Sequence, residues 1–313
     1  TKEKKLKPSK ELPSGFEDRQ EKELLIRDFI ISNIKEVMIK YGFKYLETPS
    51  FEYTESIGKF LPDKDRPGEG VFSFKDENKW LSLRYDLTAP LARYVAKNFN
   101  IIPKPFKRYQ LGTVWRNEKP GPGRYREFLQ FDADYVGTKN LQADAELCVL
   151  ISEILERCGL SKTDYTVKIS SRKFTDKLFE KLKIESKDQI SIILRALDKI
   201  DRLGWNEAKK LLEEGRKDKS GDYTKGANLN NDQIKFIEKA LDSKSPDSED
   251  VLEIINIFEA YNFKNYKFDP SVIRGLEYYT GPIFEVNLNF EVKNSKGQTI
   301  QFGSIGGGGR YDG

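Results

Sequence analysis

The stretch from Lys107 to Gly137 constrains the fold more than any other part of the chain. It holds two runs in which apolar and polar residues alternate, separated by the sequence Pro-Gly-Pro-Gly at 120–123. Alternation with a period of two indicates β-strands, and clustered Pro and Gly residues interrupt regular structure. The stretch therefore predicts two strands joined by a Gly/Pro-rich loop.

Each predicted strand has an apolar face and a polar face. The apolar side chains are Tyr109, Leu111, Trp115, Leu129, Phe131, Ala133 and Tyr135. The other face carries Gln110, Arg116, Glu118, Arg126, Phe128, Gln130, Asp132 and Asp134. We expect the first face to join the core, whereas the second fits either a solvated sheet surface or a binding site.

The polar face and the loop supply the groups that a nucleoside triphosphate requires. Arg116 offers a guanidinium for a phosphate and Glu118 a carboxylate. Arg124 offers a second guanidinium from the loop, and Phe128 a ring on which a base can stack. We therefore expect a triphosphate site that uses no Walker loop.

Composition restricts the chemistry. The 313 residues, 37% of them hydrophobic, can bury a large core and predict two structural units. The net charge of +4 permits an anionic partner without requiring one. Histidine is absent, which excludes Ser-His and Cys-His nucleophiles, histidine bases and histidine metal ligands. Catalysis must use carboxylates, guanidiniums, hydroxyls, backbone dipoles or Mg²⁺.

The sequence favours the cytoplasm. Cys148 and Cys158 fall in one predicted helix, which argues against a disulfide framework or zinc cluster and fits a reducing compartment. No apolar run approaches a membrane span, and the basic leader over 1–13 lacks the hydrophobic stretch of a secretory signal. We expect a frayed terminus there and no membrane association.

A long helix and a strand are expected first. Residues 18–41 follow the helical period, with Asp18 and Glu21 placed as a capping pair and Gly42 as the stop. A strand over 43–49 follows. The apolar stripe of the helix is Leu24, Leu25, Ile30, Ile31, Ile34, Val37, Met38 and Tyr41.

Residues 71–86 predict a hairpin, with its turn at 76–78, that leads into a helix. Thr88 is placed to cap that helix, and Pro90 is tolerated in its first turn. Asp86 and Thr88 can thus be explained as helix caps. A carboxylate at the end of a strand can equally hold an ammonium group, so both interpretations stay open.

The second half of the chain alternates between helical and strand patterns. A helix is expected over 140–158 and a strand over 166–170. The segment 185–265 is helical in period and rich in Lys and Glu, which predicts a small helical unit inserted in a sheet domain. Strand alternation returns over 272–290.

Separate segments of the chain resemble one family. The segment WRNEKPGPGRYREF, followed by QFDAD, is similar to motif 2 of the class II aminoacyl-tRNA synthetases, and of the histidyl-tRNA synthetases in particular. The long helix and its proline-closed strand resemble motif 1, the dimer element, and LRYDLTAP resembles the amino-acid-binding segment. RGLEYYTG and GSIGGGGRYDG resemble the two histidyl signatures, although the first commonly has Asp where this chain has Glu277.

The resemblance implies an α+β fold: a class II synthetase-type antiparallel sheet flanked by helices, with a helical insertion. The catalytic core would comprise 1–184 and 266–313, and the insertion would comprise 185–265. In the family the insertion approaches the tRNA acceptor end, but its pattern here also fits a solvated bundle. Motif 3 and the anticodon-binding domain would lie beyond residue 313.

The resemblance also implies a reaction. A homodimer would activate L-histidine with ATP and Mg²⁺ and transfer it to tRNA(His). Arg116 would hold the α-phosphate and the substrate carboxylate, while Arg274 would stabilise the pentacoordinate phosphorus. Arg124 would bind the distal phosphates, Glu118 the adenine amino group, and Phe128 would stack on adenine.

Histidine would be bound by a second set of side chains. The resemblance implies Asp86, Leu87, Thr88, Arg116, Gln130, Asp134, Arg274, Tyr278 and Tyr279 as that set. Asp134 and Tyr278 would take the two imidazole nitrogens, because a pocket that hydrogen-bonds both rejects apolar amino acids. Asp86, Thr88 and Gln130 would hold the α-amino group, and Tyr279 would shape the pocket.

Two alternatives share the fold. One is the histidine-sensing regulatory subunit of ATP phosphoribosyltransferase, and the other is the synthetase-like domain of a stress kinase. A sensor needs the amino-acid pocket but not the triphosphate-binding groups. The presence of Arg116, Glu118, Arg124 and Arg274 therefore favours the synthetase.

Overall fold

A computed structural model describes residues 10–57, 70–121, 123–217, 221, 223–246, 248–273, 279–293, 297, 299–300 and 304–312. The chain divides into two compact units, residues 1–138 and 139–313. Helices and mainly antiparallel strands occur in both, which confirms the predicted α+β class. Among the described residues, no helix has the length and apolar character needed to cross a membrane.

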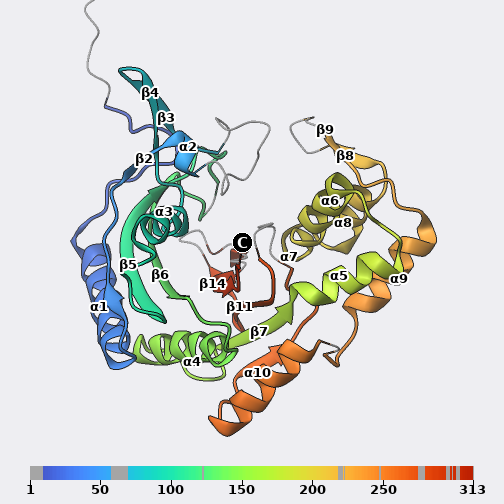
Figure 1. Cartoon of the computed structure of the whole chain (residues 1–313). Helices are drawn as coiled ribbons and strands as arrows, with labels where there is room; N and C mark the ends of the chain where they lie inside the picture. Colours follow the sequence, from blue (N-terminus) through green and yellow to red (C-terminus); the bar gives the residue numbers. More distant parts are fainter. Residues whose placement is uncertain are drawn as a thin grey trace, which may run out of the picture. The chain divides into compact units, whose positions relative to one another are not determined.

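The first unit is built on the predicted strand pair. Strands β5 (Phe106–Trp115) and β6 (Glu127–Val136) run antiparallel, and the short β1 (Lys44–Tyr45) pairs in parallel with β5. Helices α1 (Glu21–Lys40) and α3 (Thr88–Asn98) lie on opposite faces of this sheet (Figure 1). The strands and the loop between them lie where the sequence predicts them.

A smaller sheet of the first unit contains the predicted hairpin. Its strands are β2 (Phe51–Tyr53), β4 (Lys79–Leu83) and β3 (Ser73–Asp76), and the short helix α2 (Thr54–Ile57) follows β2. Glu77, at the turn, adopts a positive φ of 51°. Strand β4 ends just before the Asp86 segment and thereby places that segment beside the larger sheet.

The start of α1 differs from the prediction. The helix begins at Glu21 after Gln20, and no side chain caps it, so the capping role predicted for Asp18 is wrong. Its apolar stripe is also only partly buried. Ile34, Val37 and Met38 are enclosed. Leu25, in the first half of the helix, is 64% exposed, because α1 packs on the sheet through its C-terminal half.

The second unit contains a four-stranded sheet covered by two helices. The strand order is β10 (Tyr266–Phe268), β7 (Tyr165–Ser171), β11 (Pro282–Leu288) and β14 (Ser304–Gly309). Helices α4 (Gln142–Arg157) and α10 (Glu249–Ala260) bury apolar side chains against β7 and β11. Two further short strands, β12 (Val292–Lys293) and β13 (Thr299–Ile300), pair with each other.

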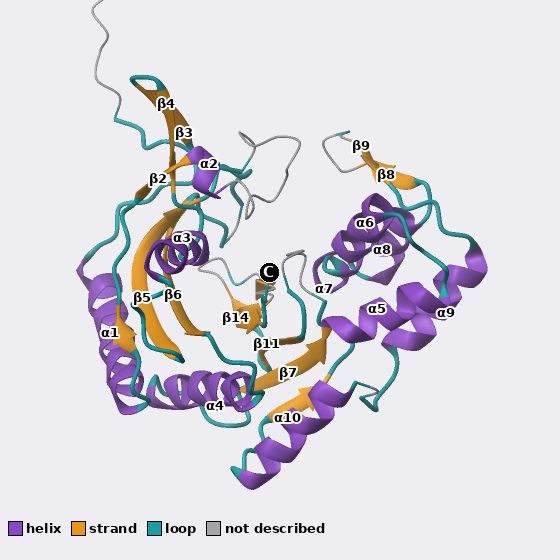
Figure 2. Cartoon of the chain, in the orientation of Figure 1, coloured by secondary structure: helices purple, strands orange, loops and turns teal. Residues whose placement is uncertain are grey.

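Figure 2 shows the remaining helices of the second unit. Their apolar side chains form a cluster of their own. These helices are α5 (Arg172–Lys181), α6 (Lys187–Leu197), α7 (Ile200–Leu203), α8 (Trp205–Leu212) and α9 (Asn231–Leu241). The hairpin of β8 (Gly215–Lys217) and β9 (Tyr223–Lys225) interrupts this helical region. The predicted domain boundaries at 184 and 265 stay a prediction.

Candidate active site

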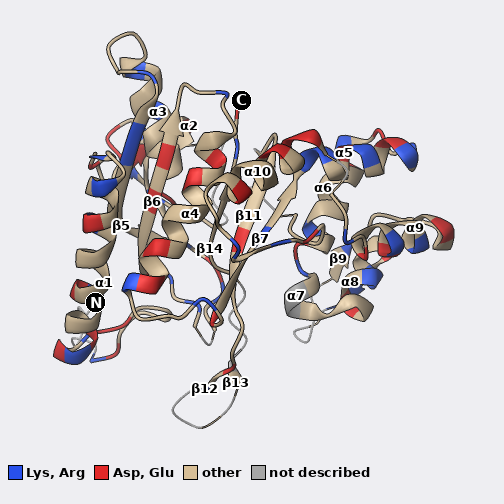
Figure 3. Ribbon diagram, turned by 90° about the horizontal axis from the view of Figure 1, so that it is seen from below, with Lys and Arg blue, Asp and Glu red and all other residues tan. Residues whose placement is uncertain are grey.

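The register of β5 and β6 gathers the polar side chains of the strand pair on one face. Arg108 stands opposite Asp134, Gln110 opposite Asp132, and Gly112 opposite Gln130. Opposed residues of antiparallel strands lie on the same face of the sheet. Figure 3 shows the basic residues of β5 beside the acidic residues of β6.

The part of this polar face around Arg108 and Asp134 is enclosed. The Arg108 side chain has no exposed surface, and Asp134 retains 9% of its surface. A charged side chain enclosed in this way requires compensating partners. At Arg108, Gln110 and Asp134 the face is therefore not an ordinary solvated surface, whereas Arg116, Phe128, Gln130 and Asp132 are half-buried.

The segment from Tyr85 to Ala89 covers the face, and the Leu87 carbonyl and the Thr88 hydroxyl bind it. Arg108 Nη2 donates to the Leu87 carbonyl at 2.8 Å, and Thr88 Oγ1 donates to Asp132 Oδ2 at 3.3 Å. Asp86 Oδ1 accepts from the backbone N–H groups of Thr88 (3.1 Å) and Ala89 (2.9 Å). The segment is thus fixed to both strands.

These contacts correct the predicted cap of α3. The helix begins at Thr88 itself, and the residue before it, Leu87, provides no side-chain cap. The carboxylate of Asp86 binds the free N–H groups of the first turn instead. Asp86 therefore does cap the helix, and it does so while buried in the polar pocket.

Three carboxylates and two guanidiniums determine the electrostatics of the pocket. Burial raises the pKa of Asp86, whereas the N–H groups of Ala89 and Thr88 and the charge of Arg116 oppose that shift. Burial, followed by the charge of Asp134, raises the pKa of Asp132 to about 7. Asp86 adds to this shift, and Arg108 and the Thr88 hydroxyl oppose it. An excess of carboxylates favours a cationic or N–H-donating ligand.

Two members of this charged group, Arg108 and Asp132, were not predicted as site residues. Both side chains lie on the polar face. Asp132 alternates with its neighbours in the same way as Gln130 and Asp134, and Arg108 stands opposite Asp134 in the register of the two strands. The alternation placed Asp132 on the polar face of the predicted strands but did not include Arg108. Their burial, however, depends on the Leu87 segment, which comes from elsewhere in the sequence.

The residues predicted to bind the nucleotide lie at the loop end of the same strands. Arg116 Nε donates to the Tyr85 carbonyl at 3.3 Å. Its guanidinium carbon lies 4.9 Å from the Tyr85 ring centre and 5.0 Å from that of Phe128. Arg124 Nη2 and Glu118 Oε2 form a salt bridge of 2.7 Å. The structure thus brings Arg116 together with Phe128, and Arg124 together with Glu118.

The loop between the strands closes in a tight turn. Gly121 and Arg124 exchange backbone hydrogen bonds of 3.2 and 2.9 Å, and Gly123 has a φ of 71°. Such a positive φ is accessible to glycine without steric cost. The turn places the Arg124 side chain, 54% exposed, at the rim of the site.

Of the predicted residues in the second unit, Tyr279 is described and buried. Its ring lies against strand β14, where a Cβ added to Gly309 would come within 2.7 Å of the ring. Arg274 and Tyr278, as well as Glu277, lie outside the described residues.

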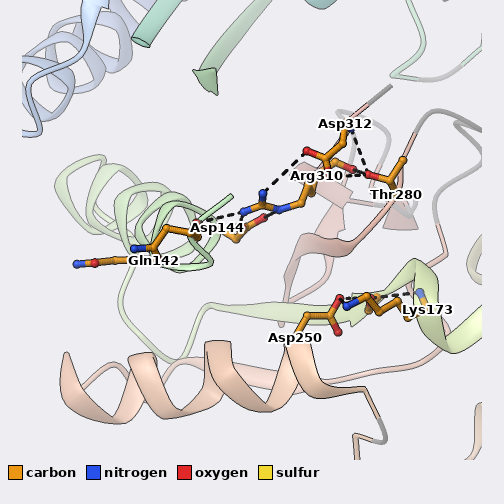
Figure 4. A network of polar contacts seen from close by, with 9 residues as sticks. Gln142, Asp144, Lys173, Asp250, Thr280, Arg310 and Asp312 are labelled. Atoms are coloured by element: carbon orange, nitrogen blue, oxygen red, sulfur yellow. Dashed lines mark hydrogen bonds and ion pairs between the residues drawn. The ribbon is translucent and has the colours of Figure 1, made fainter. Parts of the chain in front are cut away.

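A polar network holds the residues that follow Tyr279 (Figure 4). Arg310 forms an ion pair with Asp144 of α4, and its carbonyl accepts from the Thr280 backbone N–H at 2.8 Å. The Thr280 hydroxyl donates to Asp312 at 3.2 Å. The GGRYDG segment therefore anchors the chain next to Tyr279 through hydrogen bonds and an ion pair.

Comparison with known proteins identifies the family. A family model described as histidyl-tRNA synthetase matches residues 15–313. The chain belongs to the histidyl-tRNA synthetase family. The match includes both units, so the resemblance seen in separate motifs extends over nearly the whole chain.

Curated relatives within the histidyl-tRNA synthetase family are similar along the same length. A protein of Bartonella quintana (strain Toulouse) named histidine–tRNA ligase is 48% identical over 328 residues, covering 96% of this chain and 66% of that protein. One of Rhizobium meliloti (strain 1021) with the same name is 49% identical over 327 residues, covering 96% and 65%. The chain thus spans about two thirds of the length of these relatives.

Solved structures place the chain in the class II fold of histidyl-tRNA synthetases. The histidyl-tRNA synthetase of Nostoc sp. PCC 7120 is 26% identical with a TM-score of 0.69, covering 90% of this chain and 66% of that one. A Bacillus halodurans protein described as ATP phosphoribosyltransferase regulatory subunit/histidyl-tRNA synthetase gives a TM-score of 0.71 at 24% identity, covering 98% and 77%. The second likeness concerns the fold alone.

Proposed function

We propose that the protein is an ATP-dependent histidine–tRNA ligase, which activates L-histidine as histidyl-adenylate and transfers it to tRNA(His). Relatives with that name at 48% and 49% identity support the proposal. The observation that carries it is the enclosed polar face of β5 and β6, where Asp86, Gln130 and Asp134 occur together with Arg116.

The pocket fits an amino acid with a hydrogen-bonding side chain. We assign Asp134 and Tyr278 to the two imidazole nitrogens, and Asp86, Thr88 and Gln130 to the α-amino group. Asp86 is buried and its Oδ1 is fixed by two backbone N–H groups, so its carboxylate is held in one orientation. A preorganised carboxylate binds an ammonium without first reorganising. Leu87 would form part of the wall, and Tyr279 is assigned to the pocket on resemblance alone.

The loop end of the strands fits the triphosphate. In-line attack of the histidine carboxylate on the α-phosphorus requires alignment and positive charge rather than a protein nucleophile. Arg116 lies beside Asp86, so one guanidinium would contact both the substrate carboxylate and the α-phosphate. We assign Arg274, on resemblance, to the transition-state charge on the phosphorus.

Glu118 and Arg124 must separate from each other before they can bind the nucleotide. Glu118 and Arg124 pair with each other, with side chains 32% and 54% exposed. An exposed pair contributes roughly 0–1 kcal/mol, so ATP can replace it at little cost. Arg124 would then bind the distal phosphates and Glu118 the adenine amino group, with Phe128 against the adenine ring.

Mg²⁺ would enter with the triphosphate. Among the described residues, no group of three His, Cys, Asp or Glu side chains is arranged to hold a metal ion. The ion commonly binds through substrate phosphates together with few protein ligands. We therefore assign it to ATP and name no protein ligand.

Histidine-dependent exchange of pyrophosphate into ATP by the full-length protein tests the proposal. We expect exchange with L-histidine and background rates with L-glutamine, L-phenylalanine and histidinol. Aminoacylation of tRNA(His) tests the second step. Histidine binding without exchange would overturn the proposal and indicate a sensor instead.

We also propose a cytoplasmic homodimer. Helix α1 presents Leu25, Ile26 and Phe29 to solvent, and an apolar helix face of this kind fits the dimer element of the class. Sedimentation of Phe29→Asp should show monomers, whereas Leu252→Asp, at an exposed leucine of α10, should remain dimeric. Equal sedimentation of the two variants would contradict the assignment. Fractionation of cells tests the compartment.

A further inference from the structure

The side chain of Arg108 connects the two elements that contribute the polar groups of the pocket. One nitrogen, Nη2, donates to the Leu87 carbonyl at 2.8 Å and lies 3.1 Å from Asp134 Oδ2. Leu87 stands between Asp86 and Thr88, ahead of α3, whereas Asp134 belongs to β6. A single guanidinium therefore fixes the segment ahead of α3 relative to the strand.

We propose that Arg108 is a positioning residue for the amino-acid pocket: it holds the Asp134 carboxylate and the Leu87 segment in the arrangement that receives the substrate. The inference rests on the proposed function and deepens it. It concerns a residue that acts through others, since Arg108 has no exposed surface through which a ligand could reach it.

Stability alone does not account for a charge at this position. Replacing a buried ion pair by apolar residues is often neutral or stabilising, because desolvation offsets the Coulomb attraction. Moreover, Nε and Nη1 of Arg108 are buried with no hydrogen-bond partner among the described residues. The charge of the Arg108 guanidinium is instead compensated by the carboxylates of Asp134 and Asp132. Both carboxylates belong to the proposed pocket.

The electrostatic arrangement agrees with this role. Asp132 faces Asp134 on its own strand, Asp86 and the Thr88 hydroxyl on the covering segment, and Arg108 on β5. Arg108 is the cation that lowers the pKa of Asp132 against the effect of burial and the other two carboxylates. Without Arg108, the carboxylates repel one another, and the group that binds imidazole loses its fixed position.

The test compares Arg108→Gln, Arg108→Lys and Asp134→Asn in steady-state pyrophosphate exchange by the full-length protein. Arg93→Gln serves as the matched control, because Arg93 forms an ion pair of 2.6 Å with buried Glu52 elsewhere in the same unit. Circular dichroism and thermal melts identify any variant that fails to fold. Arg108→Lys keeps the charge, so it remains informative if Arg108→Gln does not fold.

Arg108→Gln should raise the KM for histidine about ten- to hundredfold, by analogy with the loss of a group that orients a metal ligand. The KM for ATP should stay within about twofold, and Arg108→Lys should show a smaller rise for histidine. In the Asp134→Asn background, Arg108→Gln should add less than about threefold, because coupled residues are not additive. The charge of Arg108 lowers the pKa of Asp132. Its removal in Arg108→Gln should therefore move the acidic limb of the pH profile of kcat/KM for histidine to higher pH.

Three results overturn the inference. The first is an unchanged KM for histidine in both Arg108 variants. The second is an equal rise in KM for histidine and ATP, matched by Arg93→Gln, which would indicate general loosening. The third is full additivity with Asp134→Asn. Absence of exchange by the wild-type protein would instead overturn the proposed function, and this inference with it.

Discussion

Arg108 and Asp134 stand directly opposite each other on β5 and β6, and their charged groups approach to 3.1 Å. The register of the strand pair creates this contact, and the Leu87 segment encloses it. Part of a sheet face with polar residues at alternate positions is thereby buried. The variants below test individual parts of that pocket.

Asp134→Asn should lower histidine activation about a hundredfold while ATP binding survives. The change removes a charged hydrogen-bond acceptor for the imidazole, and a hydrogen bond to a charged group contributes roughly 1.5–3 kcal/mol, or up to about a hundredfold. Exchange kinetics with varied histidine, together with equilibrium binding of ATP, give the two readouts. Undiminished exchange would contradict the assignment of Asp134 to the imidazole.

Asp132→Asn should make the protein's stability less dependent on pH. The pKa of Asp132 is raised from an ordinary value of 3.8 to about 7, so the folded protein keeps a proton that the unfolded chain releases. The free energy of unfolding therefore falls as pH rises through this window, by on the order of 2–4 kcal/mol, and the variant lacks this loss.

Urea unfolding at pH 5 and pH 8 measures the Asp132 effect. The matched control is Asp76→Asn, at the exposed last residue of β3, which should follow the wild-type slope. If Asp132→Asn and the wild type lose stability equally between the two pH values, the buried carboxyl has no such role.

Arg124→Ala should weaken ATP binding without destabilising the protein. Its salt bridge to Glu118 is exposed, so the free energy of unfolding should change by less than about 0.5 kcal/mol. The KM for ATP should rise about tenfold, the loss expected for one charge-assisted phosphate contact, with the KM for histidine nearly unchanged. Lys209→Ala removes another exposed ion pair and should alter neither constant. An unaltered KM for ATP in Arg124→Ala would remove this residue from the site.

Gly309→Ala should displace Tyr279. The added Cβ would come within 2.7 Å of the Tyr279 ring and 2.8 Å of the Pro282 carbonyl oxygen, so the ring or the strand must move. Overpacking of this kind typically costs about 1–3 kcal/mol. Urea unfolding and the KM for histidine are the measurements.

The matched control for this change is Gly121→Ala, where a Cβ would meet no described heavy atom within 4 Å. It should leave the free energy of unfolding within about 0.5 kcal/mol of the wild type. A Gly309→Ala variant as stable as Gly121→Ala would show that β14 accommodates a side chain at this position.

The outer part of α1 illustrates where prediction from the sequence fails. Its period correctly predicts a helix, because the spacing of apolar residues reflects the backbone geometry. The stripe does not reveal which of its residues are covered. Leu25 continues the pattern of Met38 but is exposed, since burial depends on partners that come from other segments.

By itself, the sequence determined the strand pair with its loop and the hairpin at 71–86. It also determined that Arg116, Gln130 and Asp134 share one face, because these features follow from local alternation and turn residues. The tertiary structure alone decided that the polar face is enclosed, that Asp86 caps α3, and that Arg108 and Asp132 belong to the pocket. The physical reason is desolvation. The raised pKa of Asp132 and the buried ion pair of Arg108 and Asp134 arise only when a distant segment excludes water from the sheet face: Leu87 lies 21 residues before Arg108, and Thr88 lies 44 residues before Asp132.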